Sequence, residues 1–265
     1  MPEREAIGVR ILIPIDETRE DVRHFPARRR TKARGLETTT MEALLRAIVD
    51  DDRNGVEVML AGNPSLAARL VSRPKLYQAK IFHWLYAGDT ALHLAAAGYR
   101  VEIARLLLRA GADPSARSNH RRSSPLHYAA DGYITGPVWN AKRQLSTIEC
   151  LLDAGADING QDMNGATPLH RATRTRCVEA VRYLLKAGAD PLLKNKPGSA
   201  PFHLAVQNTG RGGSGAPQAV AAQREIINEF LSFGLSPELK TSGGKTVRDC
   251  AKSTWIRELL ACSEN

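Results

Sequence analysis

Apolar residues recur along the chain at the spacing of short amphipathic helices. In the segment VEIARLLLRAGADP, which begins at Val101, the side chains of Ile103, Leu106 and Leu107 share one helical face. The segment VEAVRYLLKAGADP, which begins at Val178, repeats the pattern. Apolar spacing of i, i+3 and i+4 predicts a helix with one buried face. The glycine near the end of each segment stands where a helix ends in a left-handed turn.

A shorter apolar segment with a histidine precedes each amphipathic run. The four segments read GDTALHLA, SSPLHYA, GATPLHRA and SAPFHLA, and their histidines are His93, His127, His170 and His203. In GATPLHRA, Thr167 is placed to cap a helix and Pro168 to occupy its first turn, where the missing N–H costs nothing. Two short helices in a unit of about 33 residues are typical of a repeat protein.

The T-P-L-H segment followed by L-L-x-A-G-A-D resembles the ankyrin repeat, over roughly residues 41–262. The resemblance implies an all-α fold: an ankyrin-repeat solenoid of stacked helix pairs with β-turn fingers. It also implies that each histidine forms hydrogen bonds locally and ties neighbouring fingers together. Terminal units are expected to be atypical because one of their faces meets water.

The resemblance divides the chain into four parts. We expect a non-repeat basic N-terminal segment, partly disordered and with a short strand near Ile11, then a helical N-terminal cap, four ankyrin repeats and a degenerate C-terminal capping repeat. Their boundaries are 1–40, 41–86, 87–239 and 240–265, and the repeats span about 87–117, 118–161, 162–194 and 195–239. Within the cap, the segments MEALLRAIV, GVEVML and SLAARLV are expected to be helical.

The repeated histidines suit a structural role better than metal binding or catalysis. Stacked units lie about 8–10 Å apart, whereas histidine nitrogens on one zinc ion each lie about 2 Å from it. The segment SGGKT is similar to the end of a phosphate-binding loop, but Leu239 stands where that motif needs glycine. The sequence therefore predicts no metal site, no cofactor and no enzymatic activity.

Charge and cysteine content narrow the class of partner. The chain of 265 residues carries 37 Lys and Arg against 28 Asp and Glu, a net charge of +9. This balance is compatible with an acidic protein, a nucleic acid or an anionic surface. Four scattered cysteines without a C-x-x-C pair favour the cytoplasm, with the nucleus as the alternative if the basic run at 28–34 is a targeting signal. No apolar run is long enough to cross a membrane.

Two insertions and several basic groups depart from the plain repeat. Relative to the third unit, the second has 10 extra residues and the fourth has 13, both between the two helices of the unit. Arg174 and Arg176, at the end of a first helix, lie between the two insertions along the stack. The candidate partner-binding residues are Arg117, Arg121, Arg122, Tyr128, Trp139, Arg171, Arg174, Arg176, Lys194, Lys196 and Arg211.

These features predict a non-enzymatic protein–protein interaction module. Its partner is expected to be acidic and to meet the basic fingers, the first-helix surface and the insertion loops. The alternative is a nucleic-acid-binding or phosphate- or anion-binding regulatory protein. Few aromatic residues stand among the basic finger residues in the sequence, which disfavours stacking on single-stranded bases. The oligomeric state is left open.

Overall fold

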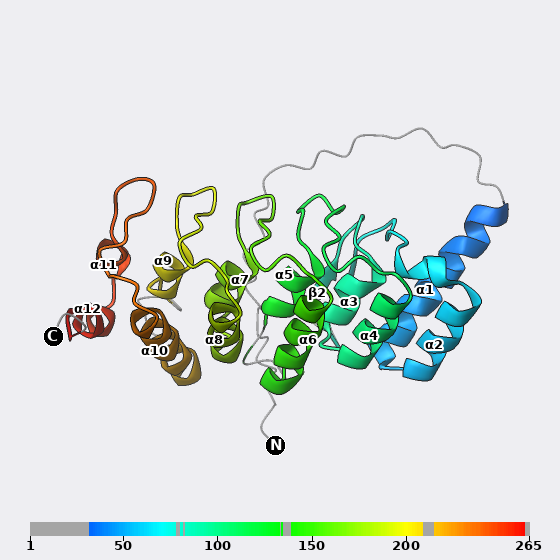
Figure 1. The fold of residues 1–265 in the computed structure, drawn as a ribbon, viewed down its shortest axis with the longest axis horizontal. Helices are drawn as coiled ribbons and strands as arrows, with labels where there is room; N and C mark the ends of the chain where they lie inside the picture. Colours follow the sequence, from blue (N-terminus) through cyan, green and yellow to red (C-terminus); the bar gives the residue numbers. More distant parts are fainter. Residues whose placement is uncertain are drawn as a thin grey trace, which may run out of the picture.

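The protein is a stack of helix pairs with loops projecting from one edge (Figure 1). The computed structural model describes residues 32–77, 80–81, 83–132, 134, 139–208 and 215–262. The strand expected near Ile11 lies outside these residues. The stack is the all-α solenoid that the repeats predict, and the projecting loops are its fingers.

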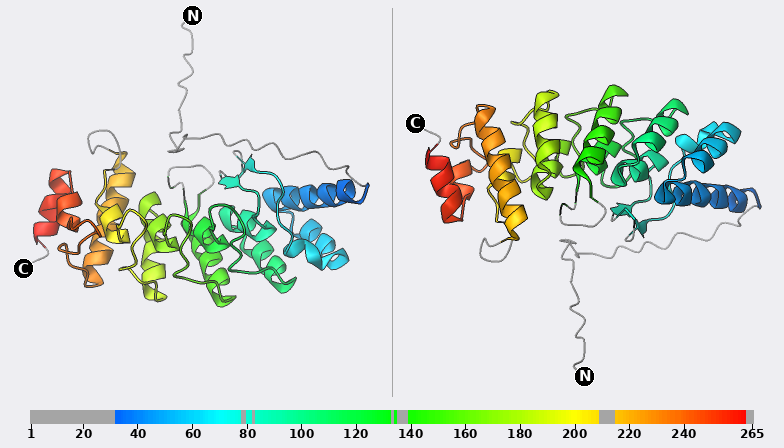
Figure 2. Two further views of the ribbon diagram at one scale, coloured as in Figure 1. Left: turned by 90° about the horizontal axis from the view of Figure 1, so that it is seen from above. Right: turned by 90° about the horizontal axis from the view of Figure 1, so that it is seen from below.

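The helices form two layers, and each helix packs on the same layer of the next unit. The inner layer contains α1 (Lys32–Asp50), α3 (Ala91–Ala97), α5 (Pro125–Ala130), α7 (Pro168–Thr175), α9 (Pro201–Ala205) and α11 (Val247–Cys250). The outer layer contains α2 (Arg53–Gly62), α4 (Val101–Arg109), α6 (Ala141–Asp153), α8 (Val178–Lys186), α10 (Pro217–Ser232) and α12 (Thr254–Ala261). The stack is bowed, with the inner layer on its concave side (Figure 2).

The core lies between the two layers and runs the length of the stack. Ile103 and Leu107, on the predicted apolar face of α4, are fully buried. In the fourth unit the rings of Phe202 and Phe230 lie 5.2 Å apart and join α9 to α10. Burying each such side chain contributes about 1.5–3 kcal/mol, so the stack depends on contact between successive units.

The N-terminal cap is less helical than its sequence suggests. Of the segment SLAARLV, only a 3₁₀ turn, η1 (Pro64–Ala67), is helical. Val71 lies outside any helix, where its N–H donates to the carbonyl of Asp89 (2.6 Å) and its carbonyl accepts from the N–H of Gly88 (2.8 Å). At the other end of the cap, α1 begins at Lys32, inside the segment expected to be non-repeat.

A β-hairpin that the sequence analysis did not predict follows η1. Its strands are β1 (Lys75–Tyr77) and β2 (His83–Leu85), antiparallel, with Leu76 opposite Trp84. The hairpin projects beyond the inner layer, on the concave side (Figure 2). The strands Lys75–Tyr77 and His83–Leu85, expected within a helical cap, therefore form a wall at one end of the concave face.

The insertions are partly helical. Helix α6 has 13 residues and α10 has 16, against 9 each in α4 and α8. The extra turns therefore lengthen the outer helices, whereas the sequence analysis placed the inserted residues in loops. Residues 133, 135–138 and 209–214 of the insertions lie outside the described residues, so the expected role of the insertion loops in partner binding remains a prediction. None of the helices in the described ranges is long and apolar enough to cross a lipid bilayer.

Candidate partner-binding surface

Four buried histidines tie each finger to the next. The Nδ1 atom of His93 accepts from the backbone N–H of Thr90 (3.0 Å). The neutral ring therefore carries its proton on Nε2, which donates to the carbonyl of Ser123 in the next finger (3.0 Å). The other three repeat this contact at 2.9–3.0 Å: His127 with Ala166, His170 with Ser199 and His203 with Leu239. The hydrogen bonds expected from the repeat motif are thus present.

These histidines are neutral because they are buried. Burial lowers the pKa of His93, His170 and His203, and lowers that of His127 to about 4. Each ring is also fully used, with one nitrogen accepting and the other donating within the stack. In the described part of the chain, no three His, Cys, Asp or Glu residues are grouped so that they could hold a metal ion.

Backbone hydrogen bonds brace the finger tips as well. The N–H groups of three residues donate to carbonyls of the preceding finger at 2.7–2.9 Å: Met163 to Arg121, Lys196 to Asn164 and Ser242 to Gly198. Together with the histidine contacts, these bonds make the fingers one continuous ridge. The backbone of the ridge is therefore braced from finger to finger along the stack.

Arg171 forms a buried ionic network under the third finger. Its Nη2 donates to Asp162 Oδ2 (2.6 Å) and its Nη1 to Asp131 Oδ2 (3.3 Å). Asp162 Oδ1 accepts the backbone N–H groups of Asn164 and Ala166. Burial by itself would raise the pKa of the Asp162 carboxyl, but the charge and hydrogen bond of Arg171 together with the two backbone N–H groups outweigh burial, and the pKa is lowered. Arg171 is only 9% exposed, so its expected place on the binding surface is wrong.

Tyr128 is also buried, contrary to the sequence analysis. Its hydroxyl donates to Asp89 Oδ2 (2.7 Å), and its ring lies 4.4 Å from that of His83 in the hairpin. Burial raises the pKa of Tyr128 and keeps the hydroxyl protonated. Tyr128 therefore joins the first finger and the hairpin to α5, and it is not available to a partner.

Arg176 caps a helix instead of facing a ligand. It ends α7 in a left-handed conformation (φ 65°), and its guanidinium donates to the carbonyls of Thr173 (2.9 Å) and Gln207 (3.0 Å). Burial lowers its pKa to about 10. The expected place of Arg176 on the partner-binding surface is thus wrong, because its guanidinium is buried and donates to two main-chain carbonyls.

Of the two candidates in the insertions, one packs on its own stack. Trp139 is half-buried, and its Nε1 donates to Gln144 Oε1 (3.0 Å) in α6. Gln144 in turn donates to the carbonyl of Ala129 (3.0 Å). Arg211 lies outside the described residues.

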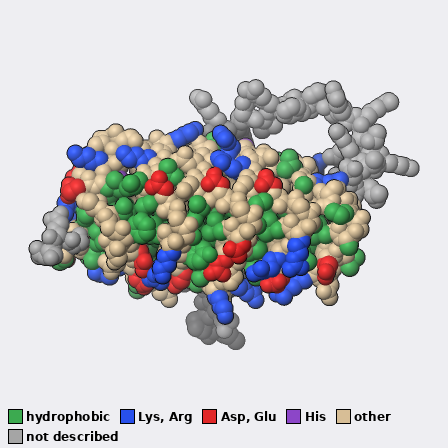
Figure 3. All heavy atoms as spheres, in the orientation of Figure 1, with side chains coloured by type: hydrophobic (Ala, Val, Ile, Leu, Met, Phe, Trp, Pro, Cys, Tyr) green, Lys and Arg blue, Asp and Glu red, His purple; other side chains and the backbone are tan. Residues whose placement is uncertain are grey.

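The remaining candidates lie on the finger ridge, except Arg174, which lies in the inner helix α7. Lys and Arg side chains lie along the finger edge with Asp and Glu side chains just below them, and the opposite edge also carries both charges (Figure 3). The third finger, 162–166, contributes no cation, and basic residues flank it on both sides. Arg122 and Lys194 are exposed, as are Arg174 and Lys196. Exposed cations therefore lie on both sides of the third finger, which itself carries none.

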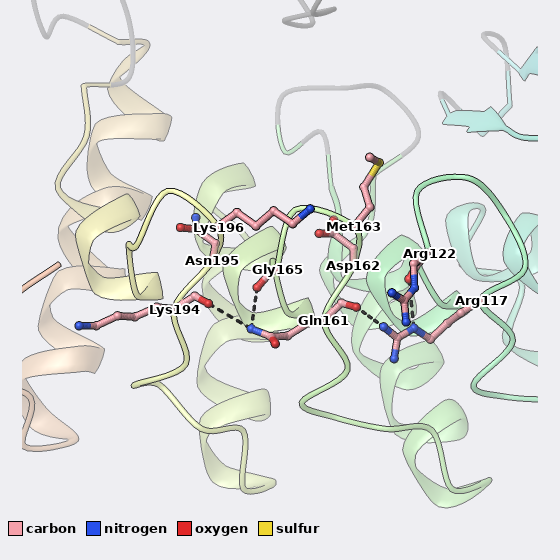
Figure 4. A pocket seen from close by; sticks show the side chains of 9 residues that line it. All are labelled: Arg117, Arg122, Gln161, Asp162, Met163, Gly165, Lys194, Asn195 and Lys196. Carbon is pink, nitrogen blue, oxygen red and sulfur yellow. Dashed lines mark hydrogen bonds between the residues drawn. The ribbon is translucent and has the colours of Figure 1, made fainter. Parts of the chain in front are cut away.

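A cavity of about 380 Å³ opens on one side of the third finger (Figure 4). Arg117 stands at one end, where its Nε donates to the carbonyl of Arg122 (3.1 Å) and its guanidinium also donates to that of Gln161. Lys196 lies across the third finger, whereas Lys194 points away from the cavity. Arg117 is therefore mainly a brace between fingers, and Lys196 is the freer cation.

A second cavity, of about 560 Å³, lies on the other side of the third finger, next to the inner helices. Arg121, Arg174 and Lys196 line it, together with the buried Arg171. Arg121 and Arg122 are neighbours in the second finger, but Arg122 has a left-handed backbone (φ 51°), and Arg122 lines the first cavity whereas Arg121 lines the second. We call this second cavity the concave groove.

Aromatic side chains adjoin the groove, which the sequence analysis missed. The guanidinium of Arg121 lies 4.9 Å above the ring of Tyr86, and the ring of Trp84 stacks 6.4 Å from that of Tyr86. The hairpin brings these aromatics to a finger more than 30 residues further along the chain. The expectation that the basic fingers have few aromatic neighbours is therefore wrong. The sequence signal for these neighbours was the presence of Trp84 and Tyr86 directly before the first repeat.

Comparison with known proteins identifies the repeats. A family model of three ankyrin repeats matches residues 138–240, and a model of a single ankyrin repeat matches residues 87–119. Ankyrin repeat and SOCS box protein 6 of Mus musculus is 37% identical over 83 residues, which are 31% of this chain and 18% of that protein. B-cell lymphoma 3 protein of Homo sapiens is 35% identical over 100 residues, 36% of this chain and 20% of that protein. The chain thus matches about a fifth of the length of these relatives.

A solved structure extends the likeness over most of the chain. The crystal structure of an ankyrin repeat domain from Acinetobacter baumannii AYE superposes with a TM-score of 0.61 at 24% sequence identity, covering 83% of this chain and 97% of that one. At this identity the likeness shows the fold alone. The two family models together span just over half of the chain, in register with the helix pairs described above. The chain therefore belongs to the ankyrin-repeat family.

Proposed function

We propose that this protein is a non-enzymatic interaction module that binds an acidic protein along its finger ridge and concave face. Ankyrin repeats are in general protein–protein interaction modules. The observation that carries the proposal is the contrast between the charges of the ridge. Asp89 and Asp162 are buried and bonded inside the stack, whereas Arg122, Lys194 and Lys196 are exposed.

The ridge suits recognition of a carboxylate-rich surface for two reasons. Its positive side chains attract an acidic partner and raise the rate of encounter. The histidine contacts and the finger-to-finger hydrogen bonds also fix the ridge in advance, so little ordering is needed on binding.

The compartment we propose is the cytoplasm. Cys150 and Cys177 are buried free thiols, and Cys262 is an exposed one. Free thiols of this kind fit a reducing compartment. Fractionation of cells that express the chain tests the proposal, and recovery from an oxidising compartment would contradict it.

The function is tested by affinity capture with the full chain as bait. The ridge variant Arg122→Gln/Lys194→Gln/Lys245→Gln removes three positive charges from the fingers. The control variant Arg105→Gln/Arg109→Gln/Lys186→Gln removes three from the outer helices. We expect acidic proteins to be captured by the wild-type chain and by the control variant, with at least a tenfold loss in the ridge variant. Equal loss in both variants would show that only net charge matters and would refute the proposed surface.

Nucleic acid is a second candidate because Arg121 stacks on Tyr86 next to Trp84. Bases stack on such aromatic platforms, and their phosphates pair with arginine. Binding of a labelled single-stranded oligonucleotide is measured at about 0.15 M salt. Tight binding that Arg121→Gln abolishes and that falls steeply with salt would favour nucleic acid over an acidic protein.

A further inference from the structure

The concave groove draws its walls from three successive units. Arg121 comes from the second finger, Asn164 from the third and Lys196 from the fourth, while Arg174 and Leu204 come from the inner helices α7 and α9. Its volume of about 560 Å³ lies in the range of ordinary ligand sites. A ligand in the groove would therefore run along the stack and contact more than one repeat.

The groove is positive because its one carboxylate is already engaged. Asp162 is held by Arg171 and by two backbone N–H groups. The side chain of Arg174 is 56% exposed and forms a long ion pair with Asp131, with 3.7 Å between Nη2 and the carboxylate oxygen. Within the described residues, Lys196 makes no ion pair. An exposed pair of this kind is weak, so an anionic ligand can compete with Asp131 for Arg174, while Lys196 has no ion-pair partner in the described part of the chain and Arg121 adds a third cation beside Tyr86.

One end of the groove leads to an exposed apolar surface. Arg121 lines the groove and also covers the ring of Tyr86. Beyond Tyr86 lies Trp84, in strand β2 of the hairpin, and this residue is 36% exposed. A ligand that follows the groove toward the N-terminal end of the stack therefore passes from cationic to aromatic side chains.

We propose that the concave groove binds an extended acidic segment of the partner, with its carboxylates at Arg121, Arg174 and Lys196 and a large apolar side chain against Tyr86 and Trp84. The inference rests on the proposed function and names the segment that this function would recognise. Fingers at a helix-packing spacing of about 10 Å place the second and fourth about 20 Å apart, which about six extended residues span.

The test uses the full chain and three fluorescein-labelled hexapeptides. The peptide WEEDEE carries both features, AEEDEE lacks the aromatic residue and WQQNQQ lacks the charge. We expect WEEDEE to bind at least tenfold more tightly than either of the other two, as measured by fluorescence anisotropy at physiological salt. Equal binding of all three would overturn the inference.

Variants locate the peptide in the groove. Arg121→Gln/Arg174→Gln/Lys196→Gln should weaken WEEDEE binding at least tenfold, whereas the outer-helix control, which also removes two arginines and one lysine, should leave it unchanged. Trp84→Ala should weaken WEEDEE but not AEEDEE, so that the two substitutions form a double-mutant cycle. Circular dichroism shows whether each variant is folded.

Two outcomes separate failure of the groove from failure of the proposed function. If the ridge variant loses WEEDEE binding and the groove variant keeps it, an acidic partner lies on the finger tips, and only the inference is wrong. If no acidic peptide binds and a single-stranded dT hexamer does, both the inference and the proposed function are wrong, and nucleic acid is the ligand.

Discussion

Replacing Arg171 by methionine should destabilise the protein far more than the same replacement at an exposed arginine. Methionine keeps much of the side-chain volume but removes the charge and every donor. Asp162 would then stay buried under the third finger without its counter-charge. Asp131 and Ser123, both within 3.3 Å of the guanidinium, would also lose a partner.

The size of the effect follows from burial. Arg171 is 9% exposed and contacts Asp162 at 2.6 Å, and removing one partner of a buried ion pair costs about 3–5 kcal/mol. Arg182 forms an ion pair with Glu229 of the next unit, with 2.7 Å between Nε and Oε1, but the Arg182 side chain is 40% exposed. Pairs of this kind contribute about 0.2–1 kcal/mol. We therefore expect Arg171→Met to cost at least about 2 kcal/mol more than Arg182→Met.

The assay is urea unfolding followed by circular dichroism, at pH 7 and at pH 4.5. In the wild-type protein the lowered pKa of Asp162 contributes stability above the unfolded-state value of about 3.9, and this contribution is lost as the pH falls. Arg171→Met removes the charge and the hydrogen bond of Arg171, so only the two backbone N–H groups still oppose the effect of burial, and the pKa of Asp162 rises above its wild-type value. The fold of the variant then binds that proton more readily than the wild-type fold does, so the gap in stability between variant and wild type should narrow at pH 4.5. Asp162→Asn in the Arg171→Met background should recover part of the loss at pH 7.

The reasoning fails if Arg171→Met costs no more than Arg182→Met, since burial would then not determine the strength of the pair. It also fails if the gap between Arg171→Met and wild type is the same at both pH values. That result would mean that the loss comes from packing, and not from an uncompensated carboxylate.

Three further predictions concern the repeat. Between pH 7.5 and pH 5, His127 becomes protonated in the unfolded chain but not in the fold, where its pKa is about 4, so this residue alone should lower the stability by about 2 kcal/mol over that range. In urea titrations, His127→Gln should be less stable than wild type at pH 7.5 but should lose about 2 kcal/mol less between pH 7.5 and pH 5. An unchanged pH dependence would contradict the burial argument. His170→Ala should lower the free energy of unfolding by about 1–3 kcal/mol and leave the metal content, measured by mass spectrometry, unchanged, whereas His120→Ala, at an exposed histidine, should lower it by less than about 0.5 kcal/mol. Stoichiometric zinc in the wild-type protein that is lost in His170→Ala would refute the structural role. Gly88 and Gly111 both have a φ of 90°, but a Cβ on Gly88 would lie 2.8 Å from Asn119 Cα whereas a Cβ on Gly111 would meet open space. Gly88→Ala should therefore lower the melting temperature clearly more than Gly111→Ala, and equal effects would show that φ alone determines the cost.

Much of this architecture follows from local sequence. The i, i+3, i+4 apolar faces, the Thr167 cap and the glycines after the outer helices predict the helix pairs and their order, because helix formation and capping depend on residues within a few positions of one another. The histidine contacts follow in turn, since a fixed unit places each ring against the next finger. That the helix pairs stack into a solenoid was predicted from the resemblance to the ankyrin repeat and not from local sequence.

Tertiary structure alone decided which charged and aromatic residues are exposed. Tyr128 and Asp89 are 39 residues apart, and Arg171 and Asp131 are 40 apart, so no local pattern distinguishes these buried groups from surface ones. Hydrogen bonds from Val71 to Gly88 and Asp89 join the chain before and after the β1–β2 hairpin, and this hairpin places Trp84 near the groove. A solenoid buries a side chain through the units on either side of it. The helices of each unit are thus determined by its own sequence, and its binding surface by its neighbours.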